Sequence, residues 1–409
     1  MNMRRNVTRD LSTDRLALIT PALLAVLLGA SACRDDAGSA SPDTIESWSL
    51  SEEPTVVIGG TDEREGYLLH RIFGATRLGD GRIVVANGSS LELKYYDPGG
   101  RHLFNSGGQG EGPGEFRSFG GFTRLPGDSV LVESWSKLTR FGPDGRQVST
   151  SEYELPPRGR CTSIEGGHRL LPDGSILLVI SVFVGLSADH EECPAPSEPR
   201  PPATIARFDP ATGLLDTIAV LPDAEKVYGI ESQYAYAKNL VHGIGRDRVY
   251  LGDTGSDTIL AMGLGGDTLA ILPVPFEAAM VPADAREKAF EDREWTGGGQ
   301  TITERTTFIY PDNYPRYARL VAAPGERVWV MAYPSLTDPV MRWVLVNPQY
   351  SLRLDEGALW RVVNSDGRAI AEVRTPPGFF LLEVGDDHVL GLHKDELERE
   401  SVQVHRLIR

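Results

Sequence analysis

Five side chains of this sequence could together bind an anionic ligand. They are Arg160, Lys238, Arg316, Tyr317 and Arg319. Four of them are cations in a chain whose formal net charge is −16, and each is expected near the start of the first strand of a repeated β-unit. Converging positive charge attracts anions. The alternative is that these residues pair with Asp and Glu residues of the three long insertions described below, as exposed ion pairs commonly do.

The histidines do not predict a metal site. The chain has 8 of them, and no two have the i,i+4 spacing of a helical metal motif. An enzyme with a metal at its centre would need ligands on several inner strands, and only His70, His168 and His242 are expected on such strands. Ordinary strand or loop histidines explain this pattern better, so we expect no metal and no cofactor.

A glycine-rich loop at residues 107–116 resembles a phosphate-binding loop in composition only. It lacks the Lys-Ser/Thr pair and the strand-to-helix context of a P-loop. We therefore do not expect nucleotide binding there. The loop is better interpreted as a tight connection in which Glu115 and Phe116 lock two neighbouring β-units together.

The three cysteines predict one lipid attachment and one disulfide. Cys33 follows the small residues Gly29-Ala30-Ser31-Ala32, as in a bacterial lipoprotein signal; the alternative is ordinary signal cleavage near Ala32. Cys161 and Cys193 then remain as a pair, and an exported protein meets an oxidising compartment.

One small antiparallel unit occurs six times along the chain. Each unit has a tight Asp/Gly-rich turn followed by a run rich in Val, Ile and Leu. The runs are IVVA, VLVES, ILLVI, VYLGD, VWVMA and HVLGL. A second turn of the same kind follows in most units, so each is interpreted as four strands, A to D. Repetition of this kind predicts a six-bladed β-propeller, an all-β fold.

The connections of such blades divide between two faces. A–B and C–D turns form one face, here called the short-turn face, and they are short throughout. B–C loops and D–A crossovers form the other, here called the insertion-rich face. Three long insertions are expected there, at residues 182–202, 279–313 and 333–356. Loops on a rigid framework commonly carry binding, which favours this face.

Two local features complete the expected fold. The segment Pro282–Trp295 has Pro near its start and charges on one side, which predicts a short helix between blades 4 and 5. Blade 6 lacks a strand D, whereas the strand Thr55–Ile58 precedes blade 1 without a partner. We predict that this N-terminal strand closes the last blade and removes an exposed edge.

The N-terminus predicts export. Residues 1–32 combine a basic start with a short apolar core and are interpreted as a lipoprotein signal peptide. Residues 33–53 are small, polar and acidic, which is typical of a flexible tether. Residues 54–409 are assigned to the propeller. The acidic composition also argues against nucleic-acid binding.

The segment 108–116, GQGEGPGEF, resembles the signature of bacterial six-bladed β-propeller lipoproteins related to NHL-repeat proteins. The start, VVIGG, and the end, GDDHVLGLHKDELERESVQVHRL, are also similar to that group. Asn87 departs from the Asp usual in its repeat, which affects one turn contact. The resemblance implies the fold far more than an activity.

These features predict a monomer, lipid-anchored in the bacterial cell envelope, that acts as a scaffold. The insertion-rich face would bind a small anionic ligand or a protein partner, and the membrane would be contacted only through the lipid. The alternative is a propeller enzyme of the lyase or lactonase type, with a metal in its central channel.

Overall fold

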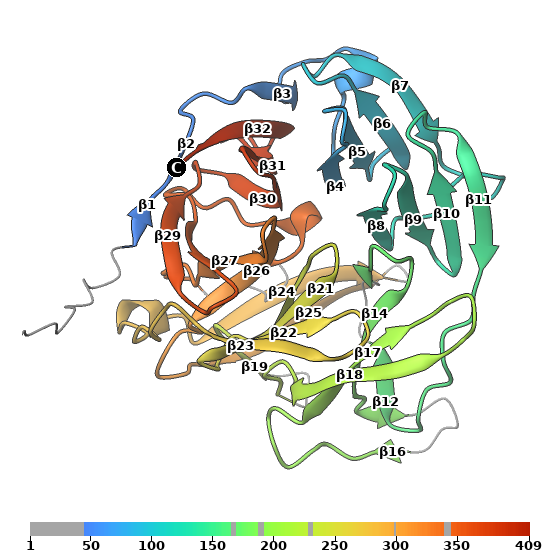
Figure 1. Ribbon diagram of the computed structural model, residues 1–409. Coiled ribbons are helices and arrows are strands. Elements are labelled where there is room, and N and C mark those ends of the chain that lie inside the picture. The colour runs from blue at the N-terminus through green and yellow to red at the C-terminus, as the bar shows by residue number, and fades with distance from the viewer. Residues whose placement is uncertain (1–44, 165–168, 187–191, 228–231, 298–299, 339–344) are drawn as a thin grey trace, which may run out of the picture. The chain divides into compact units, whose positions relative to one another are not determined.

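The repeated turns join antiparallel strands in six sheets. We describe a computed structural model (Figure 1) that covers residues 45–409 except 165–168, 187–191, 228–231, 298–299 and 339–344. The described residues form one compact unit. Among the described residues, helical structure is confined to single 3-10 turns, η1 (Glu65–Tyr67), η2 (Asp284–Arg286) and η4 (Pro348–Tyr350). No helix in the described part of the chain is long and apolar enough to span a membrane.

Each sheet follows the predicted order of strands A to D. Sheet 1 contains β4 (Ile72–Arg77), β5 (Ile83–Asn87), β6 (Glu92–Tyr96) and β7 (His102–Gly107). Sheet 2 contains β8 (Gly121–Arg124), β9 (Val130–Ser134), β10 (Lys137–Phe141) and β11 (Gln147–Glu152). Sheet 3 contains β12 (Thr162–Ile164) and β13 (Arg169–Leu170), then β14 (Ile176–Val182), β17 (Pro202–Phe208) and β18 (Leu215–Pro222).

The second half repeats this order. Sheet 4 contains β20 (Leu240–Ile244), β21 (Arg248–Asp253), β22 (Thr258–Gly263) and β23 (Thr268–Pro273). Sheet 5 contains β26 (Tyr317–Ala323), β27 (Arg327–Ala332), β28 (Leu359–Val363) and β29 (Ala369–Arg374). Sheet 6 contains β30 (Phe379–Val384), β31 (His388–Lys394) and β32 (Glu400–Ile408).

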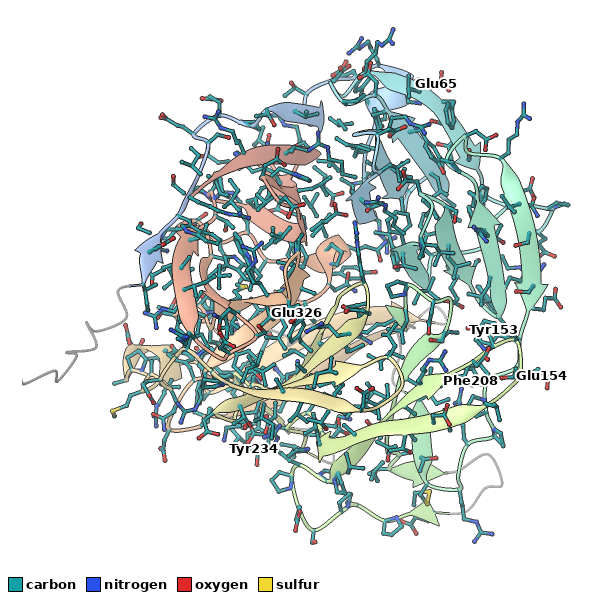
Figure 2. All side chains as sticks on the ribbon, viewed as in Figure 1. Glu65, Tyr153, Glu154, Phe208, Tyr234 and Glu326 are labelled. Carbon is teal, nitrogen blue, oxygen red and sulfur yellow. A yellow bond between two sulfur atoms is a disulfide. The ribbon has the colours of Figure 1, made fainter. Side chains whose placement is uncertain are left out.

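The core lies between successive sheets. Separate hydrophobic clusters join sheets 1 and 2, 2 and 3, 3 and 4, 4 and 5, 5 and 6, and 6 and 1. Figure 2 labels one such contact, between Tyr153 and Phe208, whose ring centroids are 6.0 Å apart. Each sheet is therefore covered on both faces by its two neighbours. This explains why strands such as β5 are buried at every position.

The N-terminal strand closes the last sheet as predicted. β3 (Val56–Gly59) pairs antiparallel with β32, and Ile58 is fully buried there. The tether predicted over residues 33–53 is wrong for its second half. β1 (Glu46–Ser47) pairs with β29, β2 (Ser49–Leu50) pairs with β32, and Trp48 packs into the cluster between sheets 5 and 6. The segment is polar on average, but the apolar side chain of Trp48 is buried and holds it against the sheets.

The helix predicted within Pro282–Trp295 is also wrong. Only η2 is helical, and β24 (Phe290–Gly297) forms a hairpin with β25 (Gln300–Ile309). β25 is rich in Thr and Ile, which favour strands. Pairing with the neighbouring strand β25 therefore overrides the local charge pattern of the segment. β19 (Ser232–Tyr234) adds parallel to the other edge of β25.

Candidate ligand-binding site

A small sheet built from two crossovers stands out on the insertion-rich face. β19 belongs to the connection between sheets 3 and 4, and β24 and β25 belong to the connection between sheets 4 and 5. We call these three strands, with residues 279–289 and 310–313, the platform. Within the described parts of the chain, its strands pair with each other and with no strand of the six main sheets. It is therefore an addition to the repeated fold.

An aromatic cluster supports the platform. Tyr236, Phe308 and Tyr314 are buried together with Val281 and Ala285. The Tyr236 and Tyr314 rings meet edge to face, with centroids 4.7 Å apart. Tyr236 donates its hydroxyl hydrogen to the carbonyl of Ala285 at 3.1 Å. Such packing fixes the platform in place rather than leaving it as a loose loop.

The platform exposes apolar side chains next to charges. Met280 is 77% exposed and Phe290 is 47% exposed. The Arg305 guanidinium lies 4.2 Å from the Phe290 ring centroid and pairs with Asp292 at 2.7 Å. Exposed aromatic and apolar groups beside an arginine are characteristic of surfaces that bind partners.

A second insertion reaches across to another sheet. In the 333–356 insertion, η4 places Tyr350 against Arg71, which donates to the tyrosine hydroxyl at 2.7 Å. Gln349 donates its side-chain amide to the carbonyl of Arg71. Sheet 5 thus contacts the first strand of sheet 1 through this loop, on the insertion-rich face.

The third insertion is held by the predicted disulfide. Cys161, just before β12, is bonded to Cys193 of β16 (Glu192–Cys193), with a Cα–Cα distance of 5.5 Å. β16 pairs with β15 (Gly185–Leu186) in a short hairpin. The bond ties the 182–202 insertion to the crossover between sheets 2 and 3.

The four cations and the tyrosine predicted as a site lie in different surroundings. Arg160 is exposed on the crossover between sheets 2 and 3. Arg316 pairs with Glu277 at 2.8 Å, a carboxylate just before the 279–313 insertion. Tyr317 is fully buried, and its hydroxyl has no hydrogen-bond partner among the described residues. Burial raises the pKa of Tyr317, so it remains neutral.

Lys238 lies beside an ion pair that the sequence pattern does not indicate. The two terminal nitrogens of Arg200 donate hydrogen bonds to the carboxylate of Asp253, at 2.6 and 3.1 Å. The Nε of Arg200 donates to the backbone carbonyl of Asp223. The Lys238 backbone donates to Glu225 at 3.1 Å. Arg200 is far from Asp253 in sequence, and only the fold shows that they meet.

Arg319 occupies a different environment from the other four. Its guanidinium carbon lies 3.7 Å from the Phe380 ring centroid and 5.6 Å from that of Trp360. Nη2 donates to the carbonyl of Leu381 at 2.8 Å. Burial lowers the pKa of Arg319 from its ordinary value. An arginine remains protonated in proteins even so.

Of the histidines expected on inner strands, His242 is the one the structure places there. It lies in β20 and lines a cavity of about 50 Å³ between sheets 3 and 4, together with Arg169, Asn239 and Asp223. Burial, with Arg169 and Arg319 as further causes, lowers the pKa of His242 well below its ordinary value. His70 precedes β4 instead, and His168 lies outside the described residues.

Glu383 is a buried carboxyl at the contact between sheets 6 and 1. It accepts a hydrogen bond from the Thr76 hydroxyl at 2.5 Å. Burial raises its pKa, while the Thr76 hydrogen bond opposes that rise. Among the described residues, no three His, Cys, Asp or Glu side chains gather closely enough to hold a metal ion.

In the glycine-rich loop, Phe116 makes the contact between sheets 1 and 2 that its sequence suggests, whereas the hydrogen bond of Glu115 lies within the loop. Phe116 is 1% exposed and packs 5.1 Å from Phe119 and 5.8 Å from Phe141, ring centroid to ring centroid. Glu115 accepts from the Gly112 backbone at 2.8 Å.

Asn87, which departs from the Asp usual in the repeat, keeps its turn contact through its side-chain oxygen. That oxygen accepts a hydrogen bond from the His70 backbone.

Comparison with known proteins adds structural similarity only. No family model and no curated protein matches the chain. A member of the DUF4221 family from Bacteroides vulgatus is 14% identical, with a TM-score of 0.49, and covers 89% of this chain and 99% of its own. An exported protein from Bacteroides fragilis is 10% identical, with a TM-score of 0.40, and covers 90% and 100%. Virginiamycin B lyase from Staphylococcus aureus is 12% identical, with a TM-score of 0.37, and covers 86% and 98%. At these values none of them assigns an activity to this chain.

Proposed function

We propose that the protein is an exported six-bladed β-propeller that acts as a binding scaffold through its insertion-rich face. Six successive sheets, each packed on the next and the sixth packed on the first, support the blade count. The relation to NHL-repeat lipoproteins remains part of this proposal, and it rests on the segment 108–116.

The observation that carries the binding role is the platform. Strands from two crossovers form one sheet that packs on a buried aromatic cluster. A connection between two blades needs neither the extra sheet nor the cluster. Exposed Met280 and Phe290 give that sheet an apolar surface, and Arg305 gives it charge. The partner we expect is a protein with an apolar and acidic patch.

The proposed location is the cell envelope, with Cys33 carrying lipid. Cys33 lies outside the described residues, so this part rests on the sequence. The enzyme alternative, a lyase or lactonase with a metal in the channel, has no ligand set among the described residues to support it.

Paired surface variants test the binding role. The double variant Met280→Ser, Phe290→Ser changes the platform, and Leu214→Ser, Leu215→Ser changes comparably exposed apolar residues at the C–D turn of sheet 3. In detergent-solubilised envelope, we expect the wild type and the Leu214/Leu215 variant to migrate as a complex and the Met280/Phe290 variant to migrate as a monomer. Migration of all three as the same complex, or of the wild type as a monomer, would reject the proposal.

A further inference from the structure

We propose that the space between sheets 4 and 5, at the short-turn face, binds a small molecule with one aromatic ring and a hydroxyl group. The structure has a cavity of about 200 Å³ there, bordered by Arg248 and Glu326 beside A–B turns and by Ser365 in a C–D turn. A cavity of about 150 Å³ is enough to hold benzene. The site is not part of the platform, so this inference goes beyond the binding role proposed above and can fail separately from it.

The cavity arises from two small side chains in sheet 4. In sheets 1, 4 and 5 the strands pair in the same register, so one residue from each of strands B, C and D lies in a row that packs against the next sheet. The rows are Val84, Tyr95 and Phe104 in sheet 1, Tyr250, Ala261 and Ala270 in sheet 4, and Trp329, Val362 and Ala371 in sheet 5. Sheet 4 thus has alanine on both strands C and D, and both alanines border the cavity.

Aromatic rings complete the packing beside the other two rows. In sheet 1 the Tyr95 and Phe104 rings stack, with centroids 4.6 Å apart. Phe104 packs so closely on the C–D turn of sheet 2 that it leaves no room for a side chain at Gly145. In sheet 5, the N-terminal segment adds Trp48 to the cluster that contains Val362 and Ala371. Beside Ala261 and Ala270 the described residues leave a cavity instead, so an aromatic ring of a ligand fits the space that a side chain fills elsewhere.

Charged residues at the cavity favour a hydroxyl group on that ring. Arg248 pairs with Glu326 at 2.6 Å and with Asp247 at 3.1 Å, so two carboxylates already balance its charge. An anionic ligand would therefore meet Glu326 without gaining a free cation. A hydroxyl group can both donate to a carboxylate and accept from a guanidinium.

Tyr250 provides a second reason for a hydroxyl group. Its side chain borders the cavity and is 1% exposed, and its own hydroxyl has no hydrogen-bond partner among the described residues. Burial raises the pKa of Tyr250 and Arg248 opposes that rise, yet the guanidinium donates its hydrogen bonds to Asp247 and Glu326. A buried hydroxyl without a partner is costly. A ligand hydroxyl next to Tyr250 would supply the missing hydrogen bond.

Ligand-observed NMR with 4-methylphenol tests the site in the purified protein. We expect saturable binding to wild type and none to Ala270→Phe, because phenylalanine there should fill the space as Phe104 does in sheet 1. Ile271→Phe is the matched control, since Ile271 is the next residue of β23 and is 63% exposed. Its affinity should stay at the wild-type value. No binding to wild type, or equal binding by wild type and Ala270→Phe, would overturn the proposal.

A smaller substitution tests the hydroxyl contact and remains informative if Ala270→Phe does not fold. Wild type should bind 4-methylphenol more tightly than toluene, which lacks the hydroxyl group. Tyr250→Phe should weaken the binding of 4-methylphenol roughly three- to tenfold, the effect of one lost hydrogen bond, and leave the binding of toluene unchanged. Equal affinities of wild type for the two probes, or an unchanged affinity of Tyr250→Phe for 4-methylphenol, would contradict the proposal. Complex formation through the platform should be unchanged in every one of these variants.

Discussion

Ile58 pairs with Val402 across β3 and β32, which joins the two ends of the folded chain in one sheet. Both side chains are fully buried, in the cluster between sheets 6 and 1. Sheet 6, which is built mainly from the C-terminal strands, is therefore completed by the N-terminal strand β3. Loss of this pairing would open the edge of β32 and remove part of the contact with sheet 1.

Substitutions within β3 test this closure. Ile58→Ala should lower the free energy of unfolding by about 2–5 kcal/mol, since it leaves a cavity in a packed core. Val57→Ala is the matched control, because Val57 lies in the same strand with its side chain 50% exposed. It should change stability by no more than about 0.5 kcal/mol. Chemical denaturation measures both, and equal effects of the two changes would argue against the pairing.

Truncations give a second measure of the same closure. Removing residues 34–44 should leave the melting temperature unchanged. Removing 34–50 should lower it, because β1, β2 and the buried Trp48 are lost. Removing 34–58 should lower it further. If all three truncations melt together, the N-terminal strands contribute nothing to the fold.

The disulfide should stabilise the sheet 3 insertion. Replacing Cys161 and Cys193 together by Ser should lower the free energy of unfolding by about 3 kcal/mol in the chain-entropy model. A reducing agent should destabilise the wild type similarly and leave the double variant unaffected. Wild-type protein purified from the oxidising compartment with two free thiols would show that the bond does not form.

Glu383 should make stability fall as pH rises. Burial raises its folded pKa above the unfolded value near 4.5, so the folded state binds more protons in the interval between the two. The stability is fully present below the unfolded pKa and is lost as pH rises through the folded pKa. Glu383→Gln should flatten this dependence in melting curves recorded from pH 4 to 8. An unchanged slope in that variant would show that Glu383 is not the group responsible.

The lipid anchor should hold the short-turn face toward the membrane. β3 is antiparallel to β32, so the chain enters sheet 6 from the short-turn side. Residues 34–44, if extended flexibly, reach roughly 17–20 Å. A quencher probe at Asp144, in a C–D turn, should therefore lie closer to lipid than one at Asp284 of the platform. The reverse order in membrane-anchored protein would reject this orientation.

The repeated turns were sufficient to predict the sheets and their order, because each hairpin is encoded by its own neighbouring residues. The burial of Trp48 is not predicted, since its partners in sheets 5 and 6 are distant in sequence. The β24–β25 hairpin is not predicted because the charge pattern of Pro282–Trp295 favours a helix there. The surroundings of the predicted site residues also depend on residues that are distant in sequence. Arg316 meets Glu277 and Arg319 meets Phe380 only in the folded chain, and nothing in the sequence distinguishes a paired arginine from an unpaired one.

Photo-crosslinking in intact cell envelopes tests the binding face most directly. A photoreactive amino acid would replace Phe290 on the platform or, as the matched control, Leu215 near the short-turn face; the two side chains are 47% and 40% exposed. We predict a discrete crosslinked product from position 290 and none from position 215. A discrete product from 215 with none from 290 would show that the insertion-rich face is not where this protein binds its partner.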